Sequence, residues 1–425
     1  YMNKIAIIGT GYVGLVTGAG MAEFGNKVIC SDIDKSKIDK INSGTIPIYE
    51  PGLGEIINRN RKCKRLSFSS NVRDSILKSD VIVIAVGTPE GEDGQADMSF
   101  VFSVVDTISN NINGYKIIVS KSTVPIGSGR KIINIINQKA GNAKLFDYVS
   151  NPEFLREGSA LKDFLWPDRV IIGTDSKKAY KIMRNVYRPL YINKNPITHT
   201  SIETAEMIKY ASNSFLALKI SYINEVANLC EVVGADVHKV ASAMGQDGRI
   251  SDKFLHPGPG FGGSCFPKDL GALLSISKKN NIKMETVEAA IKANKNQKSR
   301  MFKKLISLFE GDLKNKTITI LGLSFKANTD DVRESSAIDM IYNIINNQGL
   351  VNAYDPIAND EMSKIINNIN YFDDLYDAVK DADAVVIMTE WNEFRSLDLK
   401  KIKNNMSGNI FFDTRNIISM DELSY

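Results

Sequence analysis

The residue with the clearest chemical potential is Cys265, which lies in the stretch GPGFGGSCFPKDLGALL at residues 258–274. Glycines at positions 258, 260, 262 and 263 leave the preceding backbone bare, so that a ligand could approach it closely. The letters DLGALL predict the start of a helix, whose dipole favours a thiolate, and Lys268 adds positive charge. Because the thiolate is the nucleophilic form of cysteine, this pattern favours attack on a carbonyl carbon. The alternative, a small buried hydrophobic side chain, is our interpretation of Cys30 and Cys230.

The N-terminal stretch predicts a dinucleotide site. KIAIIG, GTGYVG, a small-residue helical pattern and KVICSD are typical of strand, glycine turn, helix and strand, with Gly9, Gly11 and Gly14 in G-x-G-x-x-G spacing. The first glycine permits the tight turn, the second lets a pyrophosphate approach the helix N-terminus, and the third allows close helix–strand packing. Asp32 ends the second strand, where an acid binds ribose hydroxyls and repels a 2′-phosphate, so NAD is favoured. Two lysines shortly after it leave an opening for NADP.

A nucleophilic cysteine together with an NAD site narrows the reaction. Simple alcohol oxidation needs a hydride acceptor and a base, but no covalent step. Oxidation of an aldehyde to an acid is easier if a thiolate adds first, because the thiohemiacetal can lose a hydride and leave a thioester for water to cleave. The two features together predict aldehyde oxidation, or oxidation of a primary alcohol all the way to a carboxylate.

The elements that must position these residues form an α/β pattern, a helical stretch and a second α/β pattern. Strand candidates DVIVIAVGTP, YKIIVSKSTVP, FDYVSNPEF and RVIIG end in polar, Gly or Pro residues, at the edge where parallel sheets bind ligands. From about residue 203 a long helix-period run follows, with no Gly or Pro before Gly234. We predict an α/β fold with two Rossmann-like doubly wound domains joined by a long central helix and a small helical dimerisation region. The expected domains are 1–202 (NAD-binding), 203–312 (central, with the cysteine loop) and 313–425 (a second Rossmann-like domain).

The third segment partly repeats the first. KTITILGLSFK resembles KIAIIGTGYVG, GLVNAYDP resembles GNKVICSDID, and DADAVVIMTEW resembles KSDVIVIAVGTP. Its glycine loop is degenerate, because Ser324 and Lys326 stand where the first domain has Gly11 and Val13. This argues against a second NAD site, and the lysine indicates a different phosphate ligand.

Composition excludes several classes of protein. The 425 residues, 43% of them hydrophobic, are enough for two or three domains, and a net charge of +4 is too balanced for a dedicated nucleic-acid or polybasic membrane protein. Four scattered cysteines without a CxxC pair and three isolated histidines argue against a disulfide framework and a metal site. Apolar runs such as VIVIAV are far shorter than the ~20 residues of a membrane span. We expect a cytoplasmic protein with no membrane or nucleic-acid partner and no metal.

Five motifs in their order along the chain resemble those of the nucleotide-sugar dehydrogenases, the UDP-glucose/GDP-mannose dehydrogenase family, and of its UDP-glucose-oxidising members in particular. They are GTGYVG, KSTVP, NPEFLREGSALKDFLWPDRVIIG, GFGGSCFPKD and GLSFKANTDDVRESS. The resemblance spans nearly the whole chain. It implies conversion of UDP-glucose to UDP-glucuronate with reduction of two NAD, through a thioester. It also implies that the N-terminal domain holds NAD and the C-terminal domain holds the UDP moiety.

The resemblance assigns catalytic roles to individual residues. Cys265 matches the nucleophile. Lys209 and Asn213, four apart on one face of the long helix, resemble the pair that reaches the sugar and the developing oxyanion; without the resemblance, Lys209 would be interpreted as a solvated lysine. Asp269 resembles the carboxylate that acts with this lysine and a bound water in C6-OH deprotonation and thioester hydrolysis. Which group takes the first proton stays open. The residues that resemble those holding the water are Thr123 and Glu153.

The resemblance also implies two binding sets. Lys326 matches a diphosphate-binding lysine, and Arg249 matches an arginine that reaches the neighbouring subunit's sugar, which implies a homodimer or a larger homo-oligomer. The cofactor set is Gly9, Gly11, Tyr12, Val13, Gly14, Asp32, Lys37, Thr88, Ser122, Thr123, Glu157, Lys268 and Arg333. The substrate set is Glu153, Phe154, Leu155, Lys209, Asn213, Arg249, Phe254, Leu255, Gly262, Phe325, Lys326 and Arg415.

Three other functions remain open. A sister enzyme would act on GDP-mannose or UDP-N-acetylmannosamine; the second type usually has a histidine before the loop cysteine, where Ser264 stands here, and the uninterrupted NPEFLREGSALKDFLWPDR block favours UDP-glucose over GDP-mannose. A two-electron hydroxyacid dehydrogenase shares the layout but would release one NADH per turnover and have no use for Cys265. A non-catalytic NAD-binding protein would bind NADH without turning over any sugar nucleotide.

Overall fold

The computed structural model describes residues 3–91, 94, 96–140, 145–192 and 196–419. By its internal contacts the chain divides into two compact units. The first comprises Tyr1–Ser212 and Gly271–Asn280, and the second comprises Asn213–Leu270 and Asn281–Tyr425.

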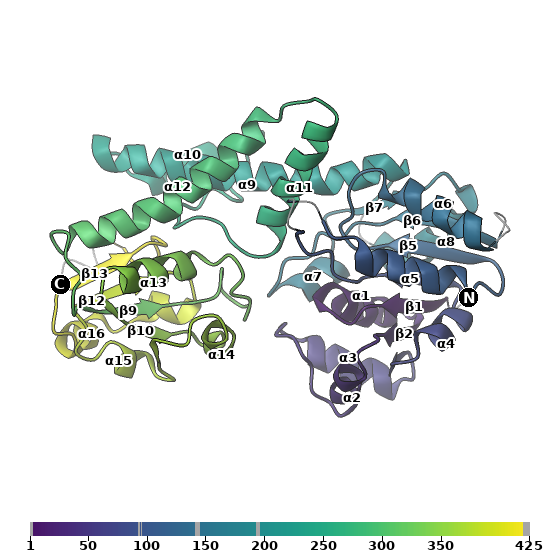
Figure 1. The fold of residues 1–425 in the computed structure, drawn as a ribbon, viewed down its shortest axis with the longest axis horizontal. Coiled ribbons are helices and arrows are strands. Elements are labelled where there is room, and N and C mark those ends of the chain that lie inside the picture. Colours follow the sequence, from purple (N-terminus) through teal and green to yellow (C-terminus); the bar gives the residue numbers. More distant parts are fainter. Residues whose placement is uncertain (1–2, 92–93, 95, 141–144, 193–195, 420–425) are drawn as a thin grey trace. The chain divides into compact units, whose positions relative to one another are not determined.

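The first unit contains an eight-stranded sheet with the strand order β3-β2-β1-β4-β5-β6-β7-β8 (Figure 1). All neighbours pair in parallel except β6 and β7. The first six strands follow the doubly wound dinucleotide-binding order, so the predicted N-terminal Rossmann-like fold is confirmed. The strands are β1 (Lys4–Ile8), β2 (Lys27–Ser31), β3 (Leu66–Ser69), β4 (Val81–Ile84), β5 (Lys116–Ser120), β6 (Phe146–Ser150), β7 (Val170–Gly173) and β8 (Ile197–Thr200).

Alternation of apolar residues along the strands builds a core on each face of this sheet. In β1, Ile5 and Ile7 enter one cluster while Ala6 and Ile8 enter the other, as expected for a sheet buried on both sides. The first face is covered by α1 (Tyr12–Glu23), α2 (Lys35–Asn42), α3 (Leu53–Lys62), α7 (Ala160–Leu165) and α8 (Lys177–Val186), and a 3₁₀ turn, η2 (Arg188–Ile192), follows. The opposite face is covered by α4 (Val72–Leu77), α5 (Ser99–Ser109) and α6 (Ser128–Ala140).

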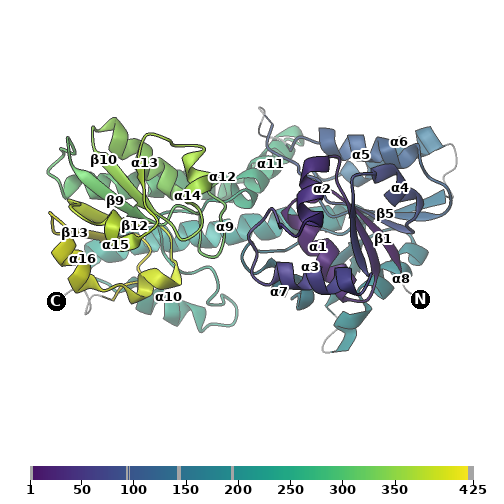
Figure 2. The ribbon, with the colours of Figure 1, turned by 90° about the horizontal axis from the view of Figure 1, so that it is seen from below.

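The second unit contains a parallel five-stranded sheet with the order β11-β10-β9-β12-β13. Helices α13 and α16 lie on opposite sides of it (Figure 2). The predicted second Rossmann-like domain is therefore confirmed. Its strands are β9 (Thr317–Leu321), β10 (Leu350–Tyr354), β11 (Asn370–Tyr371), β12 (Ala384–Ile387) and β13 (Ile410–Asp413). Its helices are α13 (Ser336–Asn346), α14 (Asn359–Ser363), α15 (Leu375–Ala378), η3 (Asn392–Ser396) and α16 (Leu399–Asn405).

The predicted central helical region is also present. The long run is one helix, α9 (Ile202–Val233), followed by α10 (Val237–Gly245), α11 (Cys265–Lys279) and α12 (Glu285–Ser307). Helix α11 begins at Cys265, four residues earlier than the letters DLGALL indicate. Pro267 fits in its first turn, because an N–H there has no helical acceptor to lose. No helix of the described residues is long and apolar enough to cross a membrane.

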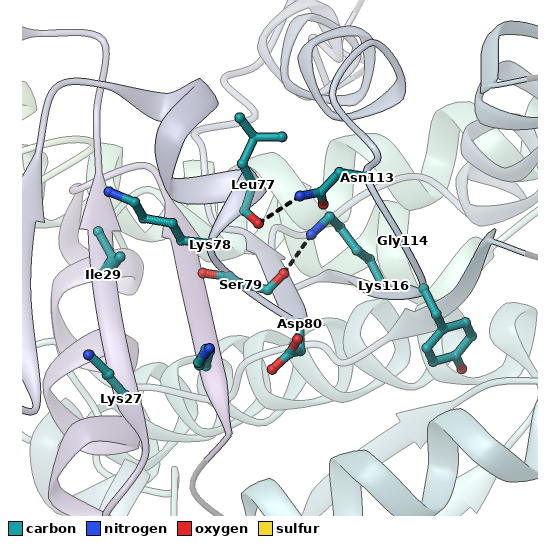
Figure 3. A pocket seen from close by; sticks show the side chains of 11 residues that line it. Lys27, Ile29, Leu77, Lys78, Ser79, Asp80, Asn113, Gly114 and Lys116 are labelled. Carbon is teal, nitrogen blue, oxygen red and sulfur yellow. Dashed lines mark hydrogen bonds between the residues drawn. The ribbon is translucent and has the colours of Figure 1, made fainter.

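A pocket of about 550 Å³ lies at the amino-terminal ends of β1, β2, β4 and β5 (Figure 3). Its lining includes Lys116, whose Nζ donates to the Ser79 carbonyl at 2.8 Å, and Asn113, whose side chain donates to the Leu77 carbonyl at 3.1 Å. These polar groups hold the loops at this edge together. Because doubly wound sheets bind ligands at the carboxyl ends of their strands, this pocket is not our candidate site.

Gly14 sets the distance between α1 and the turn before it. A Cβ on Gly14 would lie 1.9 Å from the Gly9 carbonyl oxygen, whereas a Cβ on Gly11 would meet nothing within 4 Å. We expect Gly14→Ala to lower the free energy of unfolding by about 1–3 kcal/mol through overpacking. Gly11→Ala is the matched control and should cost less. Thermal unfolding of both variants measures this, and equal midpoints would contradict the packing role of Gly14.

Candidate functional site

The turn between β1 and α1 is shaped to receive a phosphate. Gly9 has φ +104°, and a Cβ there would lie 2.7 Å from the Ala85 carbonyl oxygen, so glycine is required. Gly11 is the N-cap of α1 and offers no side chain to the first N–H groups of the helix. These donors, together with the helix dipole, suit the pyrophosphate of a dinucleotide.

Asp32 is held in place at the end of β2. Its Oδ2 accepts hydrogen bonds from the Thr10 backbone N–H at 2.9 Å and the Thr10 hydroxyl at 2.7 Å, and the Lys37 ammonium lies 3.6 Å away. Burial alone would raise the pKa of Asp32, but the Thr10 donors and the Lys37 charge outweigh it and hold that pKa below its usual range. The carboxylate is therefore ionised at neutral pH. Its Oδ1 accepts from the Asp34 N–H at 3.1 Å, and the side chain remains 16% exposed at the carboxyl end of β2.

Tyr12 is tied to a buried carboxylate that sequence reasoning overlooked. Its hydroxyl donates to Glu50, and the Gly158 N–H donates to both the Tyr12 oxygen at 2.9 Å and Glu50 Oε2 at 2.8 Å. Burial, with the adjacent carboxylate, raises the pKa of Tyr12 above its usual range. Glu157, half-buried, immediately precedes Gly158, and Val13 packs on the adjacent core. The glycine turn and the loop after β6 are thus joined through side chains.

The loops after β4 and β5 are also joined. The Ser122 hydroxyl donates to the Val86 carbonyl at 2.6 Å, and the Thr88 hydroxyl donates to the Thr123 carbonyl at 2.9 Å. Three residues of the predicted cofactor set therefore lie together at the carboxyl edge of the sheet, two of them with structural hydrogen bonds.

Lys209 and Glu153 form a buried ion pair in the first unit. Lys209 Nζ lies 2.9 Å from Glu153 Oε1, and the two side chains are only 4% and 6% exposed. The interpretation of Lys209 as a solvated lysine is therefore wrong. Glu153 Oε2 also accepts from the Leu155 N–H at 2.5 Å. Burial would raise the pKa of Glu153, but Lys209, the Leu155 donor and the nearby Lys121 together hold that pKa below its usual range.

Phe154 lies between two cations. The Arg169 guanidinium lies 3.9 Å from the centroid of its ring, and Lys209 Nζ lies 5.5 Å from it. Stacking of this kind fixes the ring by a cation–π interaction. Arg169 lies in the quoted DRVIIG stretch, but an isolated arginine before a strand carries no sequence signal that would identify this contact.

The second unit holds the cysteine and its neighbours. Cys265 is half-buried at the first residue of α11, one helical turn before Asp269. Asp269 is 1% exposed; its Oδ2 accepts from the Asn213 side-chain amide at 2.6 Å, and its Oδ1 lies 3.0 Å from Lys268 Nζ. The structure thus brings four predicted site residues into one cluster, with an ionisable thiol, a carboxylate, an amide and an ammonium.

The glycine-rich loop before Cys265 packs on the β9 side of the same unit. A Cβ on Gly262 would lie 2.2 Å from the Glu334 carbonyl oxygen, and one on Gly263 would lie 2.9 Å from the Phe325 ring. The Gly263 N–H donates to the Arg333 carbonyl at 2.8 Å. These two glycines are therefore needed for backbone packing, which is a different reason from the ligand access that we inferred from the sequence.

Phe254 is held in an unusual conformation at the start of this loop. Its φ of +64° lies in the left-handed region, which is costly for a bulky side chain, and its ring centroid lies 6.3 Å from that of Phe266. Leu255 beside it is buried. Strain of this kind clusters at ligand-binding segments, which is consistent with the predicted role of both residues.

Arg415 joins the loops that follow β9 and β12. Its Nε donates to the Met388 carbonyl at 2.7 Å, its NH2 donates to the Phe325 carbonyl at 2.9 Å, and its NH1 pairs with Glu390 at 3.1 Å. Lys326, the next residue, has its Nζ 5.5 Å from the Phe325 ring centroid. Arg415 therefore fixes the segment that carries both predicted ligand-binding residues.

Arg249 and Arg333 each pair with an acid two residues earlier in the chain. Arg249 NH2 lies 2.5 Å from Asp247, and Arg333 NH2 lies 2.6 Å from Asp331. The Arg249 side chain is 90% exposed. Its position in the single chain therefore indicates no role in a buried site.

The acid at the end of β10 differs from Asp32. Asp355 Oδ2 accepts from the Leu323 and Ser324 N–H groups, the Ser324 hydroxyl and the Trp391 indole, at 2.7–3.2 Å. With its acceptor sites used by the protein, Asp355 is a structural cap. This agrees with the prediction that the second crevice does not repeat the NAD site. No group of three or more acidic, His or Cys residues suited to a metal occurs among the described residues.

Family models cover most of the chain. They describe the UDP-glucose/GDP-mannose dehydrogenase family, with its NAD binding domain at residues 3–191, its central domain at 203–296 and its UDP binding domain at 319–420.

Similar proteins include UDP-glucose 6-dehydrogenase TuaD of Bacillus subtilis, 47% identical over 99% of this chain and 91% of that protein. UDP-glucose 6-dehydrogenase of Rhizobium meliloti is 46% identical over 99% and 97%. Among solved structures, a UDP-glucose dehydrogenase from Pyrobaculum islandicum has a TM-score of 0.93 at 34% identity, covering 99% of this chain and 96% of that one. A UDP-D-ManNAc dehydrogenase from Pyrococcus horikoshii has a TM-score of 0.87 at 29% identity, covering 98% and 96%.

The charge on Asp32 should set the choice between NAD and NADP. Asp32→Asn retains an acceptor for Thr10 but removes the repulsion of a 2′-phosphate, so we expect the preference for NAD to fall by about tenfold or more. Titration of both dinucleotides into wild type and variant measures this. Lys37→Met is the matched control and should retain the preference for NAD. A wild-type protein that binds both equally would contradict the assignment.

Proposed function

The chain belongs to the UDP-glucose/GDP-mannose dehydrogenase family, and we propose that it oxidises UDP-glucose to UDP-glucuronate in two NAD-dependent steps, with Cys265 as the nucleophile. The observation that carries the proposal is the cluster of Cys265, Asp269 and Asn213 around the start of α11. A family NAD binding domain, with its glycine turn and ionised Asp32, fits the cofactor. Bound NAD supplies the hydride acceptor for each oxidation.

The first oxidation converts the C6 alcohol to an aldehyde. C6 loses a hydride, and the hydroxyl proton must pass to a base of the protein. Asp269, buried and bonded to Asn213, and Lys209, buried and paired with Glu153, are the two candidates. In both cases a neighbouring charge or amide holds the group in one orientation, as general acid–base catalysis requires.

The second oxidation needs the thiol. The Cys265 thiolate adds to the C6 aldehyde, forming a C–S bond and the oxyanion of a thiohemiacetal. Loss of the second hydride from this oxyanion gives a thioester. Water then adds to the thioester carbonyl and the C–S bond breaks; one proton of the water goes to the leaving sulfur and the other to a base of the protein, so that carboxylate and thiol are released. We assign the orientation of this water to Thr123 and Glu153 and the stabilisation of the oxyanion to Asn213 and Lys209.

The UDP moiety belongs to the C-terminal domain. A family UDP binding domain matches residues 319–420, and within it Lys326 offers the charge for the diphosphate. Arg415 supports this role because it holds the Phe325 carbonyl next to Lys326. We assign the remaining sugar contacts to Phe154, Leu155, Phe254, Leu255 and Gly262, and Glu157, Lys268 and Arg333 to the cofactor.

We propose a homodimer or a larger homo-oligomer formed through α9. Phe215, Tyr222 and Leu229 are spaced by seven residues, so they share one face of the helix, and they are 51–62% exposed in the single chain. All residues of helix α10 are described, and none of its own residues is buried. An exposed apolar stripe along one face of a helix favours a protein interface. Assembly through it would give the exposed Arg249 a neighbouring site to reach. The free thiols of Cys30, Cys63 and Cys230 suit a reducing compartment, the cytoplasm.

The substrate is tested by supplying NAD with UDP-glucose, GDP-mannose or UDP-N-acetylmannosamine and counting NADH per sugar consumed. We expect two NADH per UDP-glucose and far less turnover with the other two, because the similar proteins named above include UDP-glucose 6-dehydrogenases at 46–47% identity. Turnover of none of the three would overturn the proposed function, and one NADH per sugar would indicate a two-electron enzyme.

Cys265→Ala tests the covalent step. The variant should still bind NAD and UDP-glucose but should make almost no UDP-glucuronate, with at most one slow round of NADH formation. Removing one member of a catalytic unit commonly costs several orders of magnitude in rate. Cys265→Ser, with a hydroxyl that is rarely ionised, should be nearly as slow. The measurement is NADH per sugar under single-turnover conditions, with mass spectrometry of an adduct on wild-type Cys265.

The control for this experiment is Cys63→Ala, because Cys63 is an exposed thiol outside the site and its loss should leave the rate unchanged. A Cys265→Ala protein that still yields two NADH per sugar at the wild-type rate would show that the thiol is not the nucleophile.

A further inference from the structure

A second buried lysine is hydrogen-bonded to Asn151, which lies two residues before Glu153 in the loop after β6. Lys121 follows β5 directly and is 5% exposed. Its Nζ donates to Asn151 Oδ1 at 3.2 Å and to the Tyr187 hydroxyl oxygen at 3.3 Å, and the Tyr187 hydroxyl itself donates to Asn151 Oδ1 at 2.7 Å. Both hydrogen-bond partners of this ammonium are neutral, although a buried cation is normally paired with an acid.

Burial of the Lys121 ammonium costs free energy, and an apolar side chain could make nearly the same packing contacts. Its Nζ lies 5.8 Å and 5.9 Å from the ring centroids of Phe164 and Tyr187, which gives weak cation–π attraction. Burial lowers the pKa of Lys121 to about 8, Glu153 opposes this shift, and Lys209 adds to it. A methionine could fill the same space without this penalty, so the charge itself needs an explanation.

We infer that Lys121 is a positioning residue for the Glu153–Lys209 pair: its ammonium keeps Glu153 a carboxylate when Lys209 is neutral, the state in which Lys209 can accept a proton. This inference rests on the proposed function, which assigns Glu153 and Lys209 to the catalytic set. Lys121 itself touches neither substrate nor cofactor in this account, and acts through the charge of Glu153.

The reason lies in where a proton from Lys209 can go. The 2.9 Å bond from Lys209 Nζ to Glu153 Oε1 is a direct transfer route, and burial favours the neutral carboxylic acid. If the Lys209 proton moved to Glu153, both groups would be neutral, and Glu153 would no longer attract Lys209 or orient the water as a carboxylate. A second cation near Glu153 disfavours the acid, so the carboxylate continues to orient Lys209 and the water.

Few other charged groups near Lys121 could influence the ionisation of Glu153. The groups that face Lys121 are Asn151 and Glu153 from the loop after β6, Lys209 from α9, Phe164 from α7 and Tyr187 from the end of α8. Burial raises the pKa of Tyr187 above its usual range, so that hydroxyl stays neutral throughout the working range of pH. The charged groups that act on Lys121 are Glu153 and Lys209, and of these two Glu153 is the negatively charged one.

Two neutral variants separate charge from hydrogen bonding. Lys121→Met removes both, whereas Lys121→Gln retains a donor for Asn151; the Tyr187–Asn151 bond remains in either case. Lys116→Met is the matched control, because Lys116 is a buried lysine at the other end of the same strand that donates to the Ser79 carbonyl. Thermal unfolding of the three variants identifies any that fail to fold.

The direct measurement is the titration of the Glu153 carboxyl by ¹³C NMR, with Glu153→Gln used to assign the signal. We expect both Lys121 variants to raise its midpoint by about one pH unit or more, since loss of a nearby opposite charge removes a shift of that size. The acid limb of the kcat profile should move upward by the same amount, so kcat should fall about tenfold on that limb, whereas kcat near pH 7 and both KM values should stay within about twofold of wild type. Lys116→Met should change neither the titration nor the profile.

An unchanged Glu153 midpoint in both variants would overturn the inference. A change in Lys121→Met that Lys121→Gln does not share would also overturn it, because hydrogen bonding would then be the cause. The NMR titration needs no turnover. A raised midpoint in a protein that oxidises no sugar nucleotide would therefore contradict the proposed function alone, whereas a normal wild-type turnover with an unmoved midpoint would contradict this inference alone.

Discussion

The buried ion pair between Lys209 and Glu153 is the interaction on which the site in the first unit depends. Both charges have lost their water, and such a pair is tolerated only where geometry and further donors compensate. The Leu155 N–H and the Lys121 ammonium provide that compensation for the carboxylate. The pair thereby fixes the loop after β6 against α9, and it sets the orientation of Phe154, whose ring contacts the same lysine. Removal of either partner would leave an uncompensated buried charge.

The second strand of each sheet also ends at a carboxylate that is held by hydrogen bonds, but the two carboxylates have different surroundings. Asp32 and Asp355 each accept hydrogen bonds from the loop that follows the first strand of their sheet, from Thr10 in one case and Ser324 in the other. This shared contact explains why the two segments repeat in sequence. In the second sheet the Trp391 indole and two further backbone N–H groups use the remaining acceptor sites. One fold therefore holds a partly exposed acid in the first domain and an internal cap in the second.

The glycines before Cys265 differ in whether backbone packing requires them. Gly262 and Gly263 permit the loop to pack on the Glu334 carbonyl and the Phe325 ring, which any Cβ would prevent. Gly258 lies near Arg415, and its nearest neighbour for a Cβ is 3.5 Å away, which is ordinary contact. The loop is thus fixed by backbone packing, and the helix that it precedes can begin at the cysteine itself.

The sequence by itself determined the two Rossmann-like sheets, the long helix, the glycine turn with Asp32 and the presence of a helix after the glycine-rich loop, because these rest on local spacing and on hydrophobic periodicity. Most motifs that pointed to the family are likewise contiguous. Only the tertiary structure decided that Lys209 is buried, that Asp355 is a cap, and that Lys121 is buried against Asn151 and Tyr187. Each of these depends on which side chains meet across elements far apart in the chain. A lysine on a helix has the same letters around it whether it faces water or a carboxylate, and its environment is set by packing that spacing does not encode.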